Sequence, residues 1–388
     1  MTINSRKKAG ALLAAAALAT GLAACGSSDS KDSQSQTTTA TPSSAATHAN
    51  ALAGLYKGTV GQPPASGPAA VKGKTVLIIS CGQNTPSCAS GAKGAMDAAA
   101  AIGWQPKLFD GKFNPALYGT GVQQAVSTKV DGIILDAIDC VTAKPQLEQA
   151  RKAGIKIVAI ASYDCNDPSI GGAPLFDGQP FFAGGLKDNR AAAFAWSEMQ
   201  AKFAAARQDG KARVVLFKLD AFLAGKYMRE GLKRGFESCS GCKIVDEVPL
   251  APTDIGPKLQ QKVQSALLQH PEANTVMPGF DVLLLAGVGA GVKASGRGAH
   301  VKLFGAEGYA PTADLARQGA VAGGVAVPAD WQGWAAVDTL NRIFAGQQPV
   351  DEGLGFQAWD KTHNLGASGG YQPKIDYQAA YKKVWSAG

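Results

Sequence analysis

Four hydrogen-bonding residues follow short apolar stretches of the chain, at points where strands would end: Gln83, Asn84, Asp136 and Glu307. A carboxylate can accept two hydroxyl hydrogen bonds at once, and a side-chain amide offers both donors and acceptors. Together these residue types indicate the binding of a small polar solute. The alternatives are structural, because an aspartate at a strand end can cap the next helix and a loop amide can simply shape its loop.

Aromatic residues accompany these polar ones. Tyr163, Phe280 and Trp331 could stack on the apolar face of a sugar ring, on an aromatic solute, or only on other core residues. Two acids stand directly after two of them, in the pairs Tyr163-Asp164 and Phe280-Asp281. Arg229 could reach the same site from a helix, or it is an ordinary surface residue.

Catalysis has little support in the sequence. The four histidines are His48, His270, His300 and His363. None of them follows a predicted strand, so a histidine-based triad or a zinc hydrolase lacks a base or ligands. We therefore expect a binding protein with no metal and no cofactor.

A regular alternation of elements begins near residue 72. Predicted strands at residues 75–80, 105–110, 132–136 and 156–161 alternate with predicted helices at residues 90–103, from 114, and 144–153. The strands are apolar with little alternation, which is typical of parallel sheets covered on both faces. The first half of the chain is therefore predicted to be an α/β unit.

The same alternation restarts after an irregular stretch at residues 162–180. Predicted helices occupy residues 189–207, 226–237, 254–269, 281–293, 311–317 and 331–344, and predicted strands occupy residues 212–218, 243–248, 275–277, 301–306 and 320–327. Ligands of doubly wound sheets bind outside the carboxyl ends of the strands. Two such units facing each other would enclose a ligand between their strand-end loops.

The N-terminus carries the pattern of an export signal. Arg6, Lys7 and Lys8 precede an apolar run that is too short to span a membrane, and the run ends on Cys25. Residues 1–24 are predicted to be a signal peptide and residues 25–72 a flexible tether, because the first part of that stretch is rich in Ser, Thr and Ala. An ordinary signal peptide cut near Ala24 is the alternative to a lipidated Cys25.

Composition excludes some partners. The chain has 388 residues, 46% of them hydrophobic and 18% charged, with a formal net charge of +8. Lys and Arg are scattered outside the signal peptide, so neither nucleic acid nor a membrane surface is indicated as a partner. The length favours two domains.

Six cysteines remain once Cys25 is set aside. In an exported protein they are most simply read as three disulfides, with Cys81 near Cys88, Cys140 near Cys165 and Cys239 near Cys242. Six cysteines allow fifteen connectivities, so the pairing stays open. A zinc site or a redox Cys-x-x-C motif is the rival interpretation.

The order of these features resembles a known family. The strand end at residues 132–136, the helix end Arg234-Gly235-Phe236, the run at residues 304–308 and the cysteine after the apolar run together look like a type I substrate-binding protein of an ABC importer. More closely, the chain resembles the ribose-binding-like lipoproteins of actinobacteria that bind sugars. The resemblance covers residues 72–388.

This resemblance implies an α/β fold of two Rossmann-like lobes, joined by three hinge crossings, with the ligand cleft between the lobes. The first lobe would comprise residues 73–187 and 328–352. The second lobe would comprise residues 188–327 and 353–388. The protein would be a monomer.

The resemblance also assigns roles to residues. It places ligand contacts in the loop of Gln83 and Asn84 and at Asp136, and Glu307 stands where sugar-binding relatives carry an aspartate. The chain departs from the ribose pattern at two places, with Ala161-Ser162 and Phe280-Asp281 replacing polar pairs. Because of these departures, the resemblance does not determine which solute is bound.

The sequence thus predicts an extracytoplasmic lipoprotein, anchored to the cell membrane through lipid on Cys25, that captures a sugar or sugar-like solute for an ABC transporter permease. A surface receptor that feeds a sensor kinase would look the same. Within transport, a nucleoside, a polyol or an aromatic acid are further alternatives.

Overall fold

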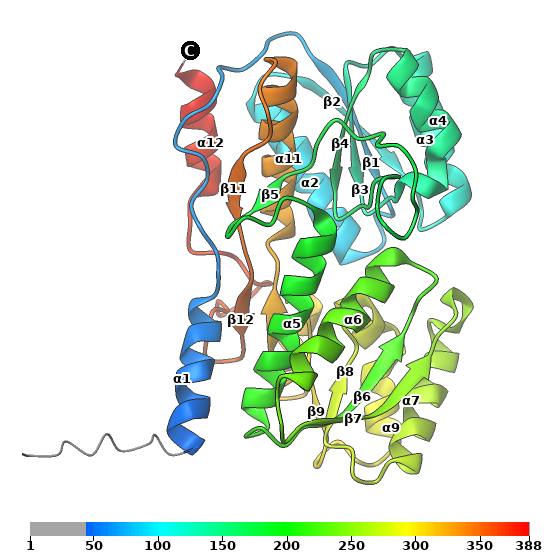
Figure 1. Ribbon diagram of the computed structural model, residues 1–388, viewed down its shortest axis with the longest axis vertical. Helices are drawn as coiled ribbons and strands as arrows, with labels where there is room; N and C mark the ends of the chain where they lie inside the picture. Colours follow the sequence, from blue (N-terminus) through cyan, green and yellow to red (C-terminus); the bar gives the residue numbers. More distant parts are fainter. Residues whose placement is uncertain (1–43, 388) are drawn as a thin grey trace, which may run out of the picture. The chain divides into compact units, whose positions relative to one another are not determined.

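The computed structural model describes residues 44–387, with side chains described from Ala49 on. Two four-stranded parallel sheets dominate this part of the chain (Figure 1). The first sheet has the strand order β2-β1-β3-β4 and the second the order β7-β6-β8-β9, so the two sheets share one topology.

The first sheet consists of β1 (Thr75–Ser80), β2 (Gln105–Asp110), β3 (Gly132–Asp136) and β4 (Lys156–Ile160). β3 is buried along its whole length and β1 after its first residue, as the unbroken apolar sequence predicted. The covering helices are α2 (Pro86–Ala101), α3 (Pro115–Ser127), α4 (Cys140–Lys152) and α11 (Ala329–Phe344). α2 packs against α11, and α3 packs against α4.

The second sheet consists of β6 (Arg213–Lys218), β7 (Lys243–Pro249), β8 (Thr275–Met277) and β9 (Lys302–Leu303). Its helices are α5 (Asn189–Arg207), α6 (Leu223–Glu237), α7 (Pro257–Gln269), α8 (Asp281–Leu283), α9 (Gly289–Ala294) and α10 (Ala310–Arg317), with the short turns η1 (Pro252–Asp254) and η2 (Leu284–Val288). The side chain of Asp188 caps α5 by accepting a hydrogen bond from the amide of Ala191 at 2.7 Å.

Three predicted elements are shorter or broken in the structure. The strand expected over residues 320–327 covers only Gly324–Ala326. The strand expected over residues 301–306 ends at Leu303, because the backbone beyond it turns toward the carboxylate of Asp281, which accepts from three amides. The helix expected over residues 281–293 is interrupted at Gly287, where a Cβ would lie 2.8 Å from the carbonyl oxygen of Gly256.

Two small sheets accompany the chain where it passes between the lobes. β5 (Phe181–Phe182) pairs in parallel with β11 (Asp351–Leu354), and β10 (Gly324–Ala326) pairs in antiparallel with β12 (Gln357–Trp359). The crossings expected near residues 187, 327–330 and 350–355 lie beside these strands. The short strands β5, β11 and β12 were not predicted.

The C-terminal helix differs from the predicted lobe boundaries. α12 (Tyr377–Ser386) packs on α11 of the first lobe, although residues 353–388 were expected in the second (Figure 1). Trp385 stacks on Trp334 with ring centroids 5.7 Å apart, and its indole donates to Asp338 at 2.7 Å. The chain therefore passes from the second lobe back to the first once more, between residues 360 and 376.

The N-terminal stretch is also more ordered than a tether to residue 72 requires. α1 (Ser44–Lys57) packs on α5 and β12, and Leu55 and Tyr56 join the core there. Residues 58–71 then run to the first lobe, where the amide of Val71 donates to Asn341 on α11 at 2.9 Å. Leu52 also packs there, and its spacing of three and four residues from Leu55 and Tyr56 places the three side chains on one face of the helix, where they can bury apolar area.

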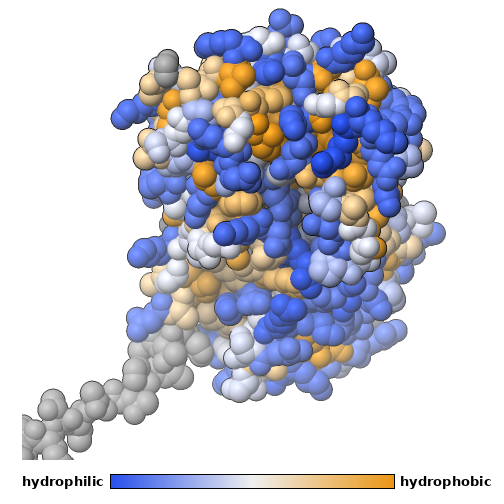
Figure 2. Space-filling model, turned by 45° about the horizontal axis from the view of Figure 1, so that its top comes forward, coloured by the Kyte–Doolittle hydropathy of each residue, from blue (hydrophilic) through white to orange (hydrophobic). Residues whose placement is uncertain are grey.

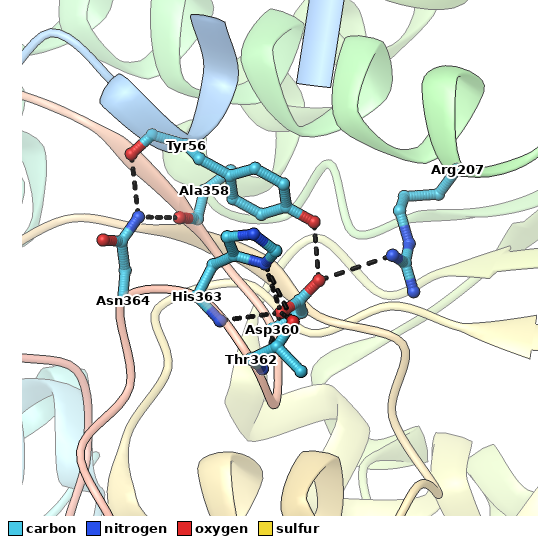
Figure 3. A network of polar contacts seen from close by, with 7 residues as sticks. All are labelled: Tyr56, Arg207, Ala358, Asp360, Thr362, His363 and Asn364. Carbon is cyan, nitrogen blue, oxygen red and sulfur yellow. Dashed lines mark hydrogen bonds and ion pairs between the residues drawn. The ribbon is translucent and has the colours of Figure 1, made fainter. Parts of the chain in front are cut away.

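A polar cluster fixes α1 to the second lobe (Figure 3). The Tyr56 hydroxyl donates to Asp360 at 2.5 Å, and its ring stacks on His363 with centroids 3.9 Å apart. Arg207 lies 3.4 Å from the same carboxylate. Burial opposes ionisation of Asp360, but hydrogen bonds from Tyr56, Thr362 and His363 lower its pKa below the ordinary value.

Candidate functional site

A cavity of about 270 Å³ lies between the two lobes, at the carboxyl ends of both sheets. The first lobe contributes the end of β3, the loop after β1 and the start of α2. The second lobe contributes α5, the loops after β6 and β8, and the loop after β9. This volume is at the small end for ligand pockets, so the cavity suits a small molecule.

Asp136, the last residue of β3, lines the cavity from the first lobe. It is 3% exposed, and its Oδ2 has no hydrogen-bond partner among the described residues. A Cβ at residue 91 would lie 2.9 Å from both carboxyl oxygens, so only glycine at that position of α2 leaves them room. Burial raises the pKa of Asp136 well above its usual value.

Glu307 lines the cavity from the second lobe. It is buried, and its Oε2 accepts from the amide of Asp281 at 2.7 Å. Burial, followed by the nearby Asp281 carboxyl, raises the pKa of Glu307 to about 8. Each lobe therefore presents one buried carboxyl to the space between them.

Asp281 has a supporting position behind this site, outside the cavity lining. Its carboxylate accepts from the amides of Ala306, Gly308 and Tyr309 at 2.7, 2.8 and 3.1 Å. These bonds hold the loop that carries Glu307. The sequence placed Asp281 among the ligand contacts, but the structure makes it the residue that positions the loop.

Two of the three predicted aromatic contacts line the cavity. Tyr163 packs edge-on against Tyr227 with ring centroids 5.0 Å apart, and Phe280 packs against Trp196 at 6.1 Å. Trp331 instead lies in the core between α11 and α12, where it stacks on Tyr377 and donates to the hydroxyl of Tyr381 at 3.0 Å. Its place at the start of α11 did not reveal that a further helix would cover it.

Four other predicted residues lie outside the cavity lining. Gln83 donates to the hydroxyl of Ser80 at 2.7 Å, and Asn84 is exposed. Asp164 accepts from the amides of Cys165 and Leu175 and so shapes its own loop. Arg229 pairs with Asp220 and Glu247 on the side of α6. Asp164 and Arg229 thus have structural partners that the local sequence does not reveal.

Several lining residues were missed by the sequence argument. They are Phe113, Tyr118, Asp139, Phe182, Asn189, Trp196, Phe222, Tyr309, Gln332 and Phe356. Asn189 donates to the carbonyl of Ser162 at 2.8 Å, which joins the two lobes beside the cavity. Four of the missed residues, Phe113, Asp139, Phe222 and Tyr309, stand shortly after a predicted strand end, where a signal was available, and the others lie on helices or in the hinge.

The cysteines pair within the first and second lobes as Cys81–Cys88, Cys140–Cys165 and Cys239–Cys242. The first pair borders the cavity. Cys140 and Cys165 lie beside Asp164 in a group of metal-ligating residue types, but both sulfurs are held in the disulfide and are not free thiolates. Cys25 lies outside the described residues.

The loop after β4 contacts α6 of the second lobe. The hydroxyl of Tyr227 on α6 lies 2.8 Å from the hydroxyl of Ser169 and donates to Asp167. Lys226 also contacts Ser169, at 3.2 Å. We call residues 163–172 the latch loop. The disulfide at Cys165 ties this loop to α4 of the first lobe.

The outer surface differs in character from the cavity. The face in Figure 2 is mostly hydrophilic, with apolar residues scattered over it, whereas aromatic and aliphatic side chains make up most of the lining. Within residues 44–387, no helix has the length and apolarity needed to cross a membrane.

Comparisons with known proteins agree with this architecture. Residues 76–348 match the family described as periplasmic binding protein domain. The comparison with curated protein sequences found no match.

Solved structures share the fold at low sequence identity. A solute-binding protein of an ABC transporter from Actinobacillus succinogenes with bound D-allose has a TM-score of 0.63 and 17% identity, over 75% of this chain and 98% of that one. A counterpart from Agrobacterium vitis bound to α-D-tagatopyranose gives 0.64 and 19%, over 75% and 95%. A periplasmic ribose ABC transporter protein from Conexibacter woesei gives 0.62 and 18%, over 76% and 95%.

Proposed function

Because the chain belongs to the periplasmic binding protein family, we propose that it captures a small solute between its two lobes outside the cytoplasm and delivers it to the permease of an ABC transporter. The family consists of binding proteins, in agreement with the expectation that the chain is not an enzyme. The solved neighbours with bound allose and tagatose favour a sugar or sugar-like solute as the first class to test.

One observation carries this proposal: a buried carboxyl from each lobe, Asp136 and Glu307, faces the same cavity. A solute that contacts both lobes stabilises the state in which they are close together. The permease can then distinguish the occupied protein from the empty one by the arrangement of the lobes.

The proposal extends to the N-terminus. Cys25 would carry the lipid, residues 1–24 would be removed, and the remaining stretch before α1 would link the anchor to the second lobe. Two or more acyl chains hold a protein at a membrane, at about 0.8 kcal/mol per buried methylene. A Cys25→Ala variant should be released into the medium, while wild type stays with the membrane fraction. Release of wild type would contradict the anchor.

A thermal-shift screen tests solute capture. Sugars, polyols, nucleosides and aromatic acids are added singly, and a ligand at about 100 times its dissociation constant should add about 2.7 kcal/mol to the free energy of unfolding. Asp136→Ala and Glu307→Ala should each abolish the shift, whereas Arg229→Ala should not. A ligand whose shift survives both cavity variants would place the site elsewhere.

Delivery needs its own test. Membrane vesicles that carry the cognate permease should show ATPase activity that rises with the loaded protein and not with the empty one. Solute binding without any effect on the permease would contradict the transport role.

A further inference from the structure

The cavity is rich in aromatic side chains. Nine aromatic side chains line it: Phe113, Tyr118, Tyr163, Phe182, Trp196, Phe222, Phe280, Tyr309 and Phe356. They come from both lobes and from the hinge. Aromatic rings bury apolar surface of a ligand, and their negative faces attract cations.

The polar groups of the lining are few, and many already have protein partners. Asn189 is bonded to Ser162, Oδ1 of Asp139 accepts from the amide of Tyr163 at 3.0 Å, and Glu307 accepts from Asp281. Among the fully buried side-chain atoms of the lining, only Oδ2 of Asp136 lacks a partner in the described part of the chain. A ligand donor would satisfy it.

The ionisable groups of the lining are acids. Those other than tyrosine are Asp136, Asp139 and Glu307, and the lining residues that the structure describes include no Lys, Arg or His. An anionic solute would therefore be buried without a cation to compensate it, which is strongly unfavourable. A cationic solute would instead form an ion pair with a carboxylate of the lining.

We infer that the cavity binds an organic cation, namely a primary amine carried on an aromatic or compact apolar ring, with its ammonium group against the open Oδ2 of Asp136 and its ring among the aromatic side chains. This inference rests on the proposed function and names the solute class of the same site.

The empty and occupied states differ in the environment of the Asp136 carboxyl. Without ligand, burial disfavours its ionised form and raises its pKa above the usual value. An ammonium group beside Asp136 opposes this effect, because a nearby positive charge favours the ionised carboxylate and donates charge-assisted hydrogen bonds to it.

A sugar fits the lining less well. A monosaccharide buries several hydroxyl groups, and each buried hydroxyl without a partner costs roughly 1–3 kcal/mol. Besides three tyrosine hydroxyls, the polar side chains of the lining are those of Ser87, Asp136, Asp139, Thr142, Asn189, Glu307 and Gln332. Asp139, Asn189 and Glu307 are already bonded to the protein, which leaves few positions for a sugar. An amine with an apolar body needs partners for one polar group, and Asp136 can provide one.

Matched probes separate these chemistries by calorimetry on the mature full-length protein at pH 7.5. Phenethylamine carries the ammonium, 2-phenylethanol replaces it by a hydroxyl, and phenylacetate replaces it by a carboxylate. D-Ribose and D-allose represent sugars. We expect phenethylamine to bind at least tenfold more tightly than 2-phenylethanol, with no measurable binding of phenylacetate or of either sugar.

Two variants locate the effect. Asp136→Asn keeps the size of the side chain and removes its charge, and it should lower the affinity for phenethylamine at least tenfold while barely changing that for 2-phenylethanol. Asp97→Asn is the control, because this exposed acid on α2 of the same lobe pairs with Lys93 outside the cavity. It should bind phenethylamine like wild type.

The cation inference is overturned if 2-phenylethanol binds as tightly as phenethylamine, if phenethylamine does not bind, or if the Asp136→Asn variant keeps the amine preference. Binding of a sugar to wild type that is lost in the Asp136→Asn variant would also overturn the cation inference. That result would still support the proposed capture of a solute in this cavity. Failure of every solute in the wider screen to stabilise the protein would instead count against the proposed function itself.

Discussion

Gly91 controls where the carboxyl of Asp136 can lie. A Cβ at this position would come within 2.9 Å of both carboxyl oxygens, closer than atoms in folded proteins normally approach. Gly91→Ala should therefore displace the carboxyl and lower ligand affinity at least tenfold, while the helical circular dichroism stays the same. Gly54→Ala is the control, because the structure has no atom within 4 Å of the added methyl group. A Gly91→Ala protein with wild-type affinity would show that Asp136 does not hold the solute.

Glu307 makes the stability of the empty protein depend on pH. Its folded-state pKa of about 8 lies above the ordinary value of 4.5, so the native state binds more protons than the unfolded state between these values. The free energy of unfolding must then fall as pH rises through this window. Glu307→Gln cannot ionise, and denaturant titrations from pH 5 to pH 8 should show a flatter decline for this variant. Equal slopes for both proteins would contradict the raised pKa.

At the scale of elements, the latch loop joins the first lobe to α6 through Tyr227. Tyr227→Phe keeps the ring that packs on Tyr163 and removes the hydroxyl that contacts Ser169 and Asp167. A hydrogen bond of this kind contributes about 1 kcal/mol. We expect roughly fivefold faster ligand dissociation in stopped-flow measurements, with the association rate nearly unchanged. An unchanged dissociation rate would mean that the latch does not stabilise the closed state.

The N-terminal helix depends on Tyr56 for its attachment. Tyr56→Phe removes the hydrogen bond to Asp360 and leaves that carboxylate with Arg207, Thr362 and His363. We expect the free energy of unfolding in urea to fall by about 1–2 kcal/mol. Lys57→Ala, an exposed neighbour, should change it by less than about 0.5 kcal/mol. Equal stability of all three proteins would show that this contact contributes little.

The sequence predicted the sheet strands well because their signal is local. The unbroken apolar runs of β1, β3 and β6 and the cap of α5 are set by residues within each element. The predictions failed for elements whose packing or strand partners lie far away in the sequence. β11 and β12 are a few residues long, and α12 has a place to pack only because α11 offers Trp334 to Trp385. Such contacts join segments far apart in the chain, which no periodicity reports.

The candidate site shows the same division. Asp136 and Glu307, which line the cavity, could be singled out because they stand after predicted strands, whereas the lining residues Trp196 and Phe356 come from a helix and from the hinge. Asp164 and Asp281 have the right position along the chain, but their carboxylates are already occupied by backbone amides. Whether an acid at a strand end faces the ligand or holds a loop depends on the fold around it.

At the scale of the whole molecule, five segments connect the lobes. Three were expected, and residues 58–71 and 361–376 add two more. The extra connections contact α11, α12 and the loop after β9, so they lie along the hinge. A chain held at this many points can still close, provided that the connecting segments bend together.

The central claim is that the lobes close on a solute held by Asp136 and Glu307. The most direct measurement is the inter-lobe distance by pulsed electron paramagnetic resonance, with spin labels at Val141→Cys and Leu268→Cys in a Cys25→Ser background. These positions are 49% and 62% exposed and belong to different lobes. A saturating solute should shorten the distance by several ångströms in the labelled protein and leave it unchanged when Asp136→Asn is added. A distance that stays constant while calorimetry shows full occupancy would contradict the account.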